Sequence, residues 1–448
     1  MQHLLLRLFS AALLCGSILG LRATAEPPAI PALPAIPVVR AQEKDKNGRV
    51  KLEPLPPLVE SGPFLSLGEC IAIALERQPS LKAAKASMEA TQLGYSSLMN
   101  FRKSSTLISP DLDIRKQQAQ RGLSAAAADY QKVHNEIVQD VTRLYYSAVY
   151  AHQAEPITIE LEGQLQGLID IAWALLDTET DPKKLEGLTT GKVHAMEMGL
   201  LEIRVKQNEA RTGRQQAMAA LRQAMGVENN FAFRVKDTEL PLMAQKVPFT
   251  KELAVEQALC RRPELALAAA GVDAFRLEVY AQGKIAFKRK VLTFASGADL
   301  HAKDIPAAVR TTKEYRPGGV GPELPPQLVG SKFDRVTRAM AFSQRADAVY
   351  ESARSLVGLE AENGFLELEL ATNKLQEKKR ELDIALKIEK YALENGPNTK
   401  DKSIIVQALV VAAKSRAEYL EAAFQHLMSL AAIERITAGG IQPAFPGR

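Results

Sequence analysis

The most restrictive feature of this sequence is the spacing of its apolar residues, which recur every three or four positions over long stretches. Residues 327–396 contain no proline in 70 consecutive positions. Apolar residues at an average spacing of about 3.5 lie on one side of a helix and pack against a neighbouring helix at a shallow angle. The sequence therefore predicts a mainly α fold of long antiparallel coiled-coil helices. Four leucines mark one such seam: Leu375, Leu382, Leu386 and Leu393.

The same spacing runs through residues 137–175, where Pro156 is expected to kink the helix without ending it. Two seams lie there on neighbouring faces. A helix that is apolar on two faces needs two neighbours. We expect one neighbour in the same subunit and one in the next, which predicts an obligate oligomer. The first seam is Ile137, Val141, Leu144, Ala148 and Ala151, and the second is Val138, Tyr145, Val149 and His152.

A ten-residue phrase occurs twice, as LERQPSLKAA at 75–84 and as LCRRPELALA at 259–268, 184 residues apart. Pro79 and Pro263 suit the first turn of a helix, where a missing N–H is not needed. After each phrase we expect a long helix, an irregular insert, a very long helix, a turn and another very long helix. This pattern predicts two pseudo-repeats, assigned to residues 64–240 and 241–440, followed by a C-terminal tail at 441–448.

Two turn signals interrupt the long helices. Residues 177–192 read DTETDPKKLEGLTTGK, and residues 394–401 read ENGPNTKD, in which Asn-Gly-Pro is a strong stop signal. Each turn would join two very long helices at the end opposite an insert. The residues singled out in the two turns are Gly191, Asn395, Gly396 and Pro397.

The N-terminus predicts export. Residues 1–25 combine a short basic start, an apolar run and Ala23-Thr24-Ala25, which is typical of a cleaved signal peptide. Residues 26–63 hold nine of the 24 prolines and are expected to form an extended leader. No later stretch reaches the roughly 18 apolar residues that a membrane helix needs. We therefore expect a protein of the cell envelope without a helical anchor.

The charge balance argues against a nucleic-acid partner. The 57 basic and 52 acidic residues are interspersed, whereas nucleic-acid binders concentrate basic residues on one face. The tight basic cluster at 288–290 reads as a solvated turn, or as a contact for an anionic lipid or a partner. An oxidising compartment permits a bridge between Cys70 and Cys260. Their places in the two phrases are not equivalent, so two separate buried thiols are expected.

No constellation of residues predicts catalysis, a cofactor or a metal. GLTTGKV at 187–193 has too few residues between its glycines for a phosphate loop and reads as a helix turn. The six histidines lack the spacing of a zinc site, and His152 is expected to pack on a seam. Carboxylates scattered along the helices read as a solvated face. The chain is therefore not expected to be an enzyme.

The two repeated phrases, in order, resemble those of the TolC-like outer membrane efflux family. That family opens each half with a phrase matched here by LSLGECIAIALERQPSLKAA and FTKELAVEQALCRRPELALAAA. Its second half has a tip with a tyrosine shortly before a glycine, matched here by Tyr391 and Gly396. The match extends over about residues 64–440.

The resemblance implies a homotrimer whose long helices form a periplasmic tube. It also implies four strands per protomer in a shared outer-membrane barrel. The tube would meet a periplasmic adaptor and an inner-membrane transporter, so the function implied is an export duct of a tripartite efflux system. We assign adaptor docking to the turn residues Asn395, Gly396, Pro397 and Gly191.

The inserts depart from that family pattern. Residues 99–114 are too few for two spanning strands of roughly 9–11 residues each, and residues 286–332 are rich in proline and glycine. The sequence thus predicts a reduced or degenerate β region, with peripheral or partial contact with the outer membrane. The alternative function is a non-conducting periplasmic scaffold or docking protein derived from the same fold.

Overall fold

The computed structural model describes residues 61–100, 109–178, 189–243, 247–285, 330–395 and 403–448, with Leu55 and Leu328. All described helices and strands belong to one compact unit, Val59–Lys303 with Tyr315–Arg448. The predicted signal peptide and nearly all of the predicted leader lie outside the described residues.

Ten elements follow one another along the described chain, and most are helices. In the first half they are β1 (Phe64–Leu65), α1 (Leu67–Arg77), α2 (Pro79–Met99), α3 (Leu112–Thr178), α4 (Thr190–Met225) and β2 (Arg234–Val235). In the second half they are α5 (Lys251–Arg261), α6 (Pro263–Lys284), α7 (Lys332–Asn395) and α8 (Ser403–Ile436). The two strands form a short parallel pair in which Phe64 lies opposite Arg234. The predicted mainly α-helical fold is confirmed.

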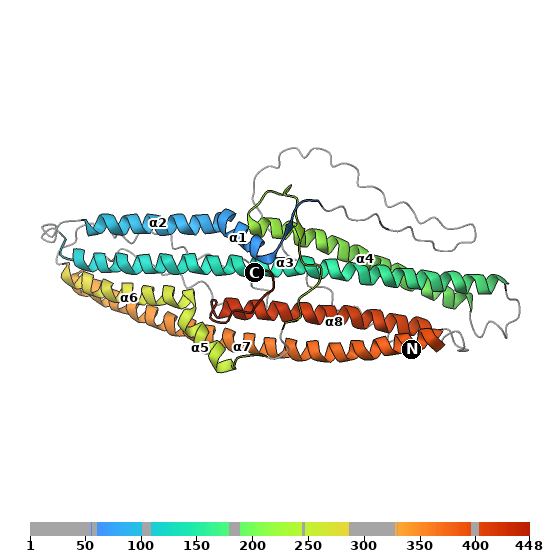
Figure 1. Cartoon of the computed structure of the whole chain (residues 1–448). Helices are drawn as coiled ribbons and strands as arrows, with labels where there is room; N and C mark the ends of the chain where they lie inside the picture. Colours follow the sequence, from blue (N-terminus) through green and yellow to red (C-terminus); the bar gives the residue numbers. More distant parts are fainter. Residues whose placement is uncertain are drawn as a thin grey trace. The chain divides into compact units, whose positions relative to one another are not determined.

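The helices lie side by side in an order that follows the two halves of the chain (Figure 1). The 67-residue α3 and the 64-residue α7 are the two long members. Along one part of its length α3 packs between α2 and α6, and along the other part it packs between α4 and α8. Helix α7 packs against α6 and α8 in the same way. The result is two hairpins, α3–α4 and α7–α8. Beyond the shorter arm of each hairpin, α2 packs against α3 and α6 packs against α7.

Helix α3 runs through Pro156 without ending, as the spacing of its apolar residues predicts. Pro156 is exposed, and proline lacks only one backbone donor. The long apolar stripes on both sides of this position therefore outweigh the loss of one helical hydrogen bond.

Both predicted seams of α3 are buried within this chain. Val141 and Ala148 of the first seam, and Tyr145 and Val149 of the second, are at most 1% exposed. They share one core with residues of α1, α4 and α8. The expectation that one of these seams faces another subunit is wrong here, because α3 already lies between several helices of its own chain.

The predicted limits of the inserts lie partly outside the described residues. Helix α2 ends at Met99 and α3 begins at Leu112, so little chain separates them. Residues 101–108 and 286–327 lie outside the described residues, and so does the prediction of a reduced β region that rests on them. Among the helices that the structure describes, none is both long enough and apolar enough to cross a bilayer.

Candidate functional site

The two proline markers occupy matching places. Pro79 begins α2 and Pro263 begins α6, and each follows a helix of 11 residues, α1 or α5. Those short helices begin in matching ways too, because the side chains of Ser66 and Thr250 each accept a hydrogen bond from a backbone N–H of the first turn. We call the two sites the first junction and the second junction. The 184 residues between Pro79 and Pro263 therefore separate two equivalent structural positions.

At the first junction, the residue before the proline binds the end of α4. Gln78 Nε2 donates to the carbonyls of Gln223 at 3.3 Å and of Ala224 at 3.0 Å. Helix α4 then ends at Gly226, which has φ +67°. The side-chain amide therefore binds two carbonyls at the C-terminus of α4, of which that of Gln223 also accepts from the Gly226 N–H at 3.1 Å.

At the second junction, an arginine occupies the same place. Arg262 is 3% exposed, and its guanidinium lies 2.9 Å from Glu264 Oε2 and 3.0 Å from Glu360 Oε2. It also approaches the carbonyl of Ile436, the last residue of α8, at 3.5 Å. Arg435 approaches Glu360 from the other side at 2.6 Å. Burial alone would raise the pKa of Glu264, but the charge of Arg262 and hydrogen bonds outweigh it and hold that pKa below its usual range.

A second buried polar network lies at the opposite ends of the helices, where the inserts attach. Arg115 near the start of α3 binds Asp111 at 2.9 Å and also binds Glu278 of α6. Gln282 donates to Glu278 at 2.6 Å and accepts from Arg335 of α7 at 3.0 Å. The network joins three helices with compensating charges, so it fixes the bases of both inserts relative to one another.

These networks correct the expectation that helical carboxylates are solvated. The carboxylates of Glu197, Glu278, Glu360 and Glu389 are all buried. Burying a charge is costly unless it is paired. Each of them contacts a polar or charged side chain that lies far along the chain or one helical turn away, and the local sequence does not reveal this pairing. The contacts of Glu197 are with Trp173 at 3.0 Å and His194 at 2.8 Å.

Cys70 and Cys260, the cysteines that the structure describes, are free, as predicted, but only Cys70 is buried. Burial raises the pKa of the Cys70 thiol to about 12, so it stays protonated. Cys260 is exposed, which corrects the expectation of two buried thiols. The place in α5 that matches Cys70 belongs to Ala254, which is fully buried, and Cys260 lies on the other face of that helix.

The turn residues lie at the ends of the two hairpins, in so far as the structure describes them. Helix α4 starts at Thr190 with Thr189 as its cap, so the segment 189–193 is a helix start, as predicted, and not a phosphate loop. Gly191 lies in its first turn, and a side chain added there would meet only Thr189 Oγ1, at 4.0 Å. Asn395 is the last residue of α7. Gly396 and Pro397 lie outside the described residues.

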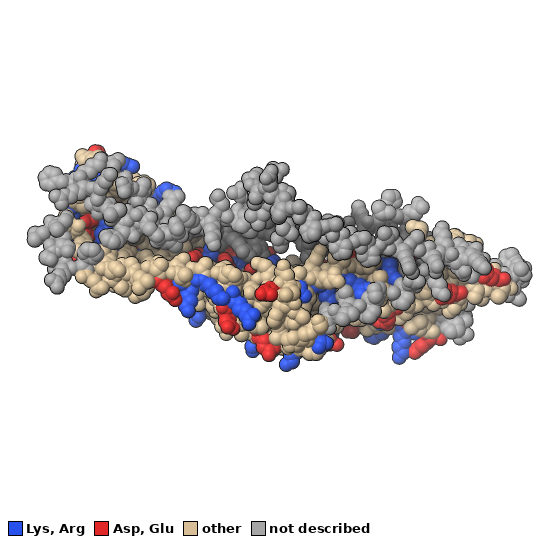
Figure 2. Space-filling model, turned by 90° about the horizontal axis from the view of Figure 1, so that it is seen from above, with Lys and Arg blue, Asp and Glu red and all other residues tan. Residues whose placement is uncertain are grey.

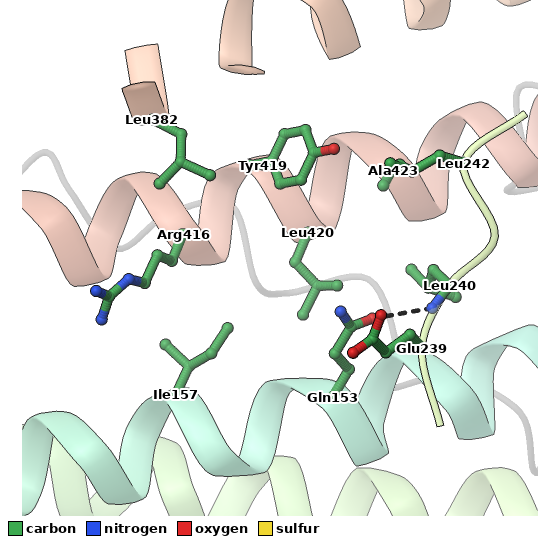
Figure 3. Close-up of a pocket in the computed structure, with 10 residues that line it drawn as sticks. All are labelled: Gln153, Ile157, Glu239, Leu240, Leu242, Leu382, Arg416, Tyr419, Leu420 and Ala423. Carbon is green, nitrogen blue, oxygen red and sulfur yellow. Dashed lines mark hydrogen bonds between the residues drawn. The ribbon is translucent and has the colours of Figure 1, made fainter. Parts of the chain in front are cut away.

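A cavity of about 290 Å³ lies between α3, α8 and the segment that follows β2 (Figure 3). Its wall is mostly apolar, with Ile157 of α3 and Leu420 of α8 facing each other. Two of the polar side chains at its edge are engaged, because Gln153 accepts a hydrogen bond from the Leu240 N–H at 3.0 Å and Arg416 binds Glu389 and Glu160. The residues that line the cavity offer no set of convergent catalytic groups.

The outer surface carries mixed charge and one long apolar stripe. Figure 2 shows basic and acidic side chains next to one another on the face that it displays. On α7, eight large apolar side chains are between 41% and 69% exposed, and six of them lie along one side of the helix. We call them the outward α7 seam: Leu359, Leu366, Leu370, Ile384, Ile388 and Tyr391. In the described part of the chain, no cluster of three or more His, Cys, Asp or Glu side chains is placed to hold a metal.

Solved structures of bacterial outer-membrane channels share this fold. The outer-membrane channel OprN is 14% identical, with a TM-score of 0.65, over 84% of this chain and 90% of that one. The open state of the MtrE channel of Neisseria gonorrhoeae is 15% identical, with a TM-score of 0.62, over 84% and 89%. VceC of Vibrio cholerae is 12% identical, with a TM-score of 0.62, over 83% and 96%. No protein-family model and no curated protein sequence matches the chain.

These neighbours establish the fold class. The chain has the fold of a TolC-like outer-membrane channel protomer, as its repeated phrases predict. OprN and MtrE are both outer-membrane channels.

Proposed function

We propose that the protein is the outer-membrane component of a tripartite efflux or export system. The observation that carries this proposal is the fold, which covers most of this chain and most of each channel that it resembles. The sequence adds a predicted signal peptide, which would deliver the chain to the envelope. In this proposal three copies assemble into a periplasmic duct, which an adaptor links to an inner-membrane transporter.

Two features of the chain support assembly into a duct. The long α3 and α7 give rigid walls, because their buried faces are held by neighbouring helices over most of their length. The outward α7 seam leaves large apolar side chains in water in an isolated copy, a pattern that marks an interaction surface. The two halves, 64–240 and 241–440, would each supply one hairpin to the wall, with 441–448 as a closing segment.

Conductance separates this function from its alternative. Purified protein inserted into a planar bilayer is expected to give discrete ion-conducting events. A non-conducting periplasmic scaffold would assemble but pass no current. Deletion of the gene should also lower the export of at least one compound, and the wild-type chain should restore it. A protein that neither conducts nor restores export would contradict the duct.

We place adaptor docking at the turn ends, on Gly191, Asn395, Gly396 and Pro397. Gly191 offers the sharpest test, because the space around its Cα is open and a large side chain should not disturb the fold. Gly191→Trp is expected to fold and assemble normally but to lose export. The matched control is Gly213→Trp, which lies farther along α4 and is equally open. Equal export by both variants would remove Gly191 from the docking surface.

Gly396 gives a second test of the same surface. Glycine tolerates a left-handed turn that a β-branched residue does not, and the Asn-Gly-Pro sequence predicts such a turn. Gly396→Val is expected to impair export and leave assembly intact. Normal export at normal abundance would exclude this turn from docking.

A further inference from the structure

The cavity between α3, α8 and the segment after β2 has an apolar buried side and an exposed mouth (Figure 3). On the buried side, Leu240, Leu420 and Ala423 line it and are each at most 6% exposed. Glu239 and Leu242 are both exposed, and they form its mouth. The volume of about 290 Å³ is close to the lower limit of roughly 300 Å³ for small-molecule pockets. The cavity therefore has room for a compact organic molecule.

The charges around the cavity favour a cation over an anion. Arg416 is the basic residue of the described lining, and its guanidinium already lies 3.0 Å from Glu389 and 3.3 Å from Glu160. Among the described residues, no hydrogen bond or ion pair engages the carboxylate of Glu239. A cation at the mouth would gain an unpaired carboxylate, whereas an anion would compete with two carboxylates for Arg416.

The wall also includes an aromatic ring, that of Tyr419 on α8 (Figure 3). Burial and the charge of Asp383 raise the pKa of the Tyr419 hydroxyl, so the side chain is neutral at ordinary pH. An ammonium ion is attracted to the face of such a ring, and a carboxylate neutralises its charge. The cavity offers the ring and the carboxylate of Glu239 beside an apolar wall.

We propose that this cavity binds a small organic ammonium ion, with the ammonium group toward Glu239 and the hydrocarbon part between Ile157 and Leu420. This inference goes beyond the proposed function, because it concerns a binding site within the wall and not passage through the duct. The lining residues come from α3, α7, α8 and the segment after β2, and so from both halves of the chain. A bound ligand therefore ties the α3–α4 hairpin to the α7–α8 hairpin.

Two matched probes test the class of ligand. Cyclohexylmethylammonium and cyclohexanecarboxylate have the same ring and opposite charges. Each is titrated into the purified protein in a non-ionic detergent, and binding is followed by ligand-observed NMR. We expect saturable binding of the cation, at least about tenfold tighter than that of the anion. Equal affinity of the two probes, or no saturable binding of the cation, would overturn the proposal.

The role of the carboxylate is tested with Glu239→Gln, which keeps the shape of the side chain and removes its charge. The affinity for the cation is expected to fall about fivefold, and the affinity for the anion should not fall. The matched control is Glu256→Gln, which removes an exposed carboxylate of α5 outside the cavity and should bind the cation as the wild type does. Equal cation affinity in the two variants would exclude Glu239 from the site and overturn the proposed orientation.

The aromatic contribution is tested with Tyr419→Leu, which keeps the wall apolar. Cation affinity is expected to fall about two- to fivefold, because the attraction between an ammonium ion and the ring is lost. Affinity for the anion should stay unchanged. An equal fall for both probes would assign the ring a packing role alone and contradict the contact with the ammonium group.

A larger side chain tests whether the cavity itself is the site. Ile157 is half-buried and faces Leu420 across the cavity (Figure 3). Ile157→Phe is expected to fill the space and abolish saturable binding of the cation, while circular dichroism shows unchanged helical content. Wild-type affinity in this folded variant would place the cation elsewhere and overturn the proposal. If Ile157→Phe fails to fold, the comparison of Glu239→Gln with Glu256→Gln decides.

These measurements use neither conductance nor export, so the two proposals can fail separately. A protein that conducts ions but does not bind the cation would lose this site and keep the duct. A protein that binds the cation in the cavity but neither conducts nor restores export would keep the site and lose the duct.

Discussion

The first and second junctions share one backbone and differ in chemistry. Gln78 has φ −59° and ψ 120°, and Arg262 has φ −61° and ψ 121°. Each is followed by a proline that opens a helix, and each reaches the last carbonyls of the helix that closes its half. The first uses a neutral amide, whereas the second uses a buried cation, the buried carboxylate of Glu360 and the partly buried carboxylate of Glu264.

The packing around each junction explains the difference. The first adjoins a large core with fully buried Tyr145 and Tyr146. The core beside the second is small and contains Ala258, Ala353 and Ala361. A proline restricts the preceding residue to extended conformations whatever its side chain. Backbone geometry can thus persist while the surrounding side chains change from apolar packing to ion pairing.

The largest expected effect is at the second junction. Arg262→Ala removes the buried cation beside Glu264 and leaves Glu360 with Arg435 alone, and should lower the free energy of unfolding by about 3 kcal/mol, the lower end for a broken buried pair. Urea unfolding followed by circular dichroism measures this. The control is Arg276→Ala, which breaks an exposed pair with Asp347 and should cost less than about 1 kcal/mol. Similar losses in the two variants would show that the buried ion pairs around Arg262 stabilise the fold no more than an exposed ion pair does.

The next effect is at the first junction. Gly226 has φ +67°, and a Cβ there would lie 2.9 Å from the Gln78 Cα. Gly226→Ala should therefore cost about 1–3 kcal/mol. At the second junction, Gly440→Ala would meet mainly the flexible side chains of Gln257 and Arg261, so we expect a smaller loss. A larger loss of thermal stability in Gly440→Ala than in Gly226→Ala would contradict the conclusion that the close backbone approach makes the first junction the more sensitive one.

A smaller effect is expected from Gln78 itself. Gln78→Ala removes hydrogen bonds to a helix end and should cost about 0.5–1.5 kcal/mol. Gln78→Glu should cost more, because a carboxylate repels the carbonyls at the C-terminus of α4. Gln78→Arg should be the mildest, since arginine can donate as Arg262 does. A more stable Gln78→Glu variant in urea unfolding would contradict this account of the contact.

The smallest expected effect is a change in how stability depends on pH. The pKa of Glu264 is held below the 4.5 of an ordinary glutamate, so its ionised form stabilises the folded state. This contribution is complete above the unfolded pKa and is lost as the pH falls through the folded pKa. Glu264→Gln should therefore flatten the decline of stability in acid, measured by urea unfolding across this range. Gln78→Ala, which removes no charge, should leave that slope unchanged.

The features that could be predicted from the sequence are those that short stretches of the chain determine. The prolines and caps located both junctions, and the apolar spacing located helices that continue through Pro156. The turn at 177–192 matches the interval between α3 and α4. Each of these depends on residues within a few turns of one another.

The sequence could not predict contacts between distant segments. Arg115 and Glu278 are 163 residues apart, and each alone is typical of a solvated helix face. The exposure of Cys260 also depends on which side of α5 meets α7. Which apolar stripes are buried within the chain likewise depends on the packing of α3, whose two seams lie against other helices of the same chain.

The segment that follows α8 has a consequence for the order in which the chain folds. Phe445 is 5% exposed and packs on Tyr146, and the carbonyl of Gly447 accepts a hydrogen bond from the Gly68 N–H at 2.8 Å. During synthesis, which proceeds from the N-terminus, α1 is present long before this segment exists. Until then, part of the site that receives α1 is missing. The first half would therefore complete its packing only when residues 445–447 have been added.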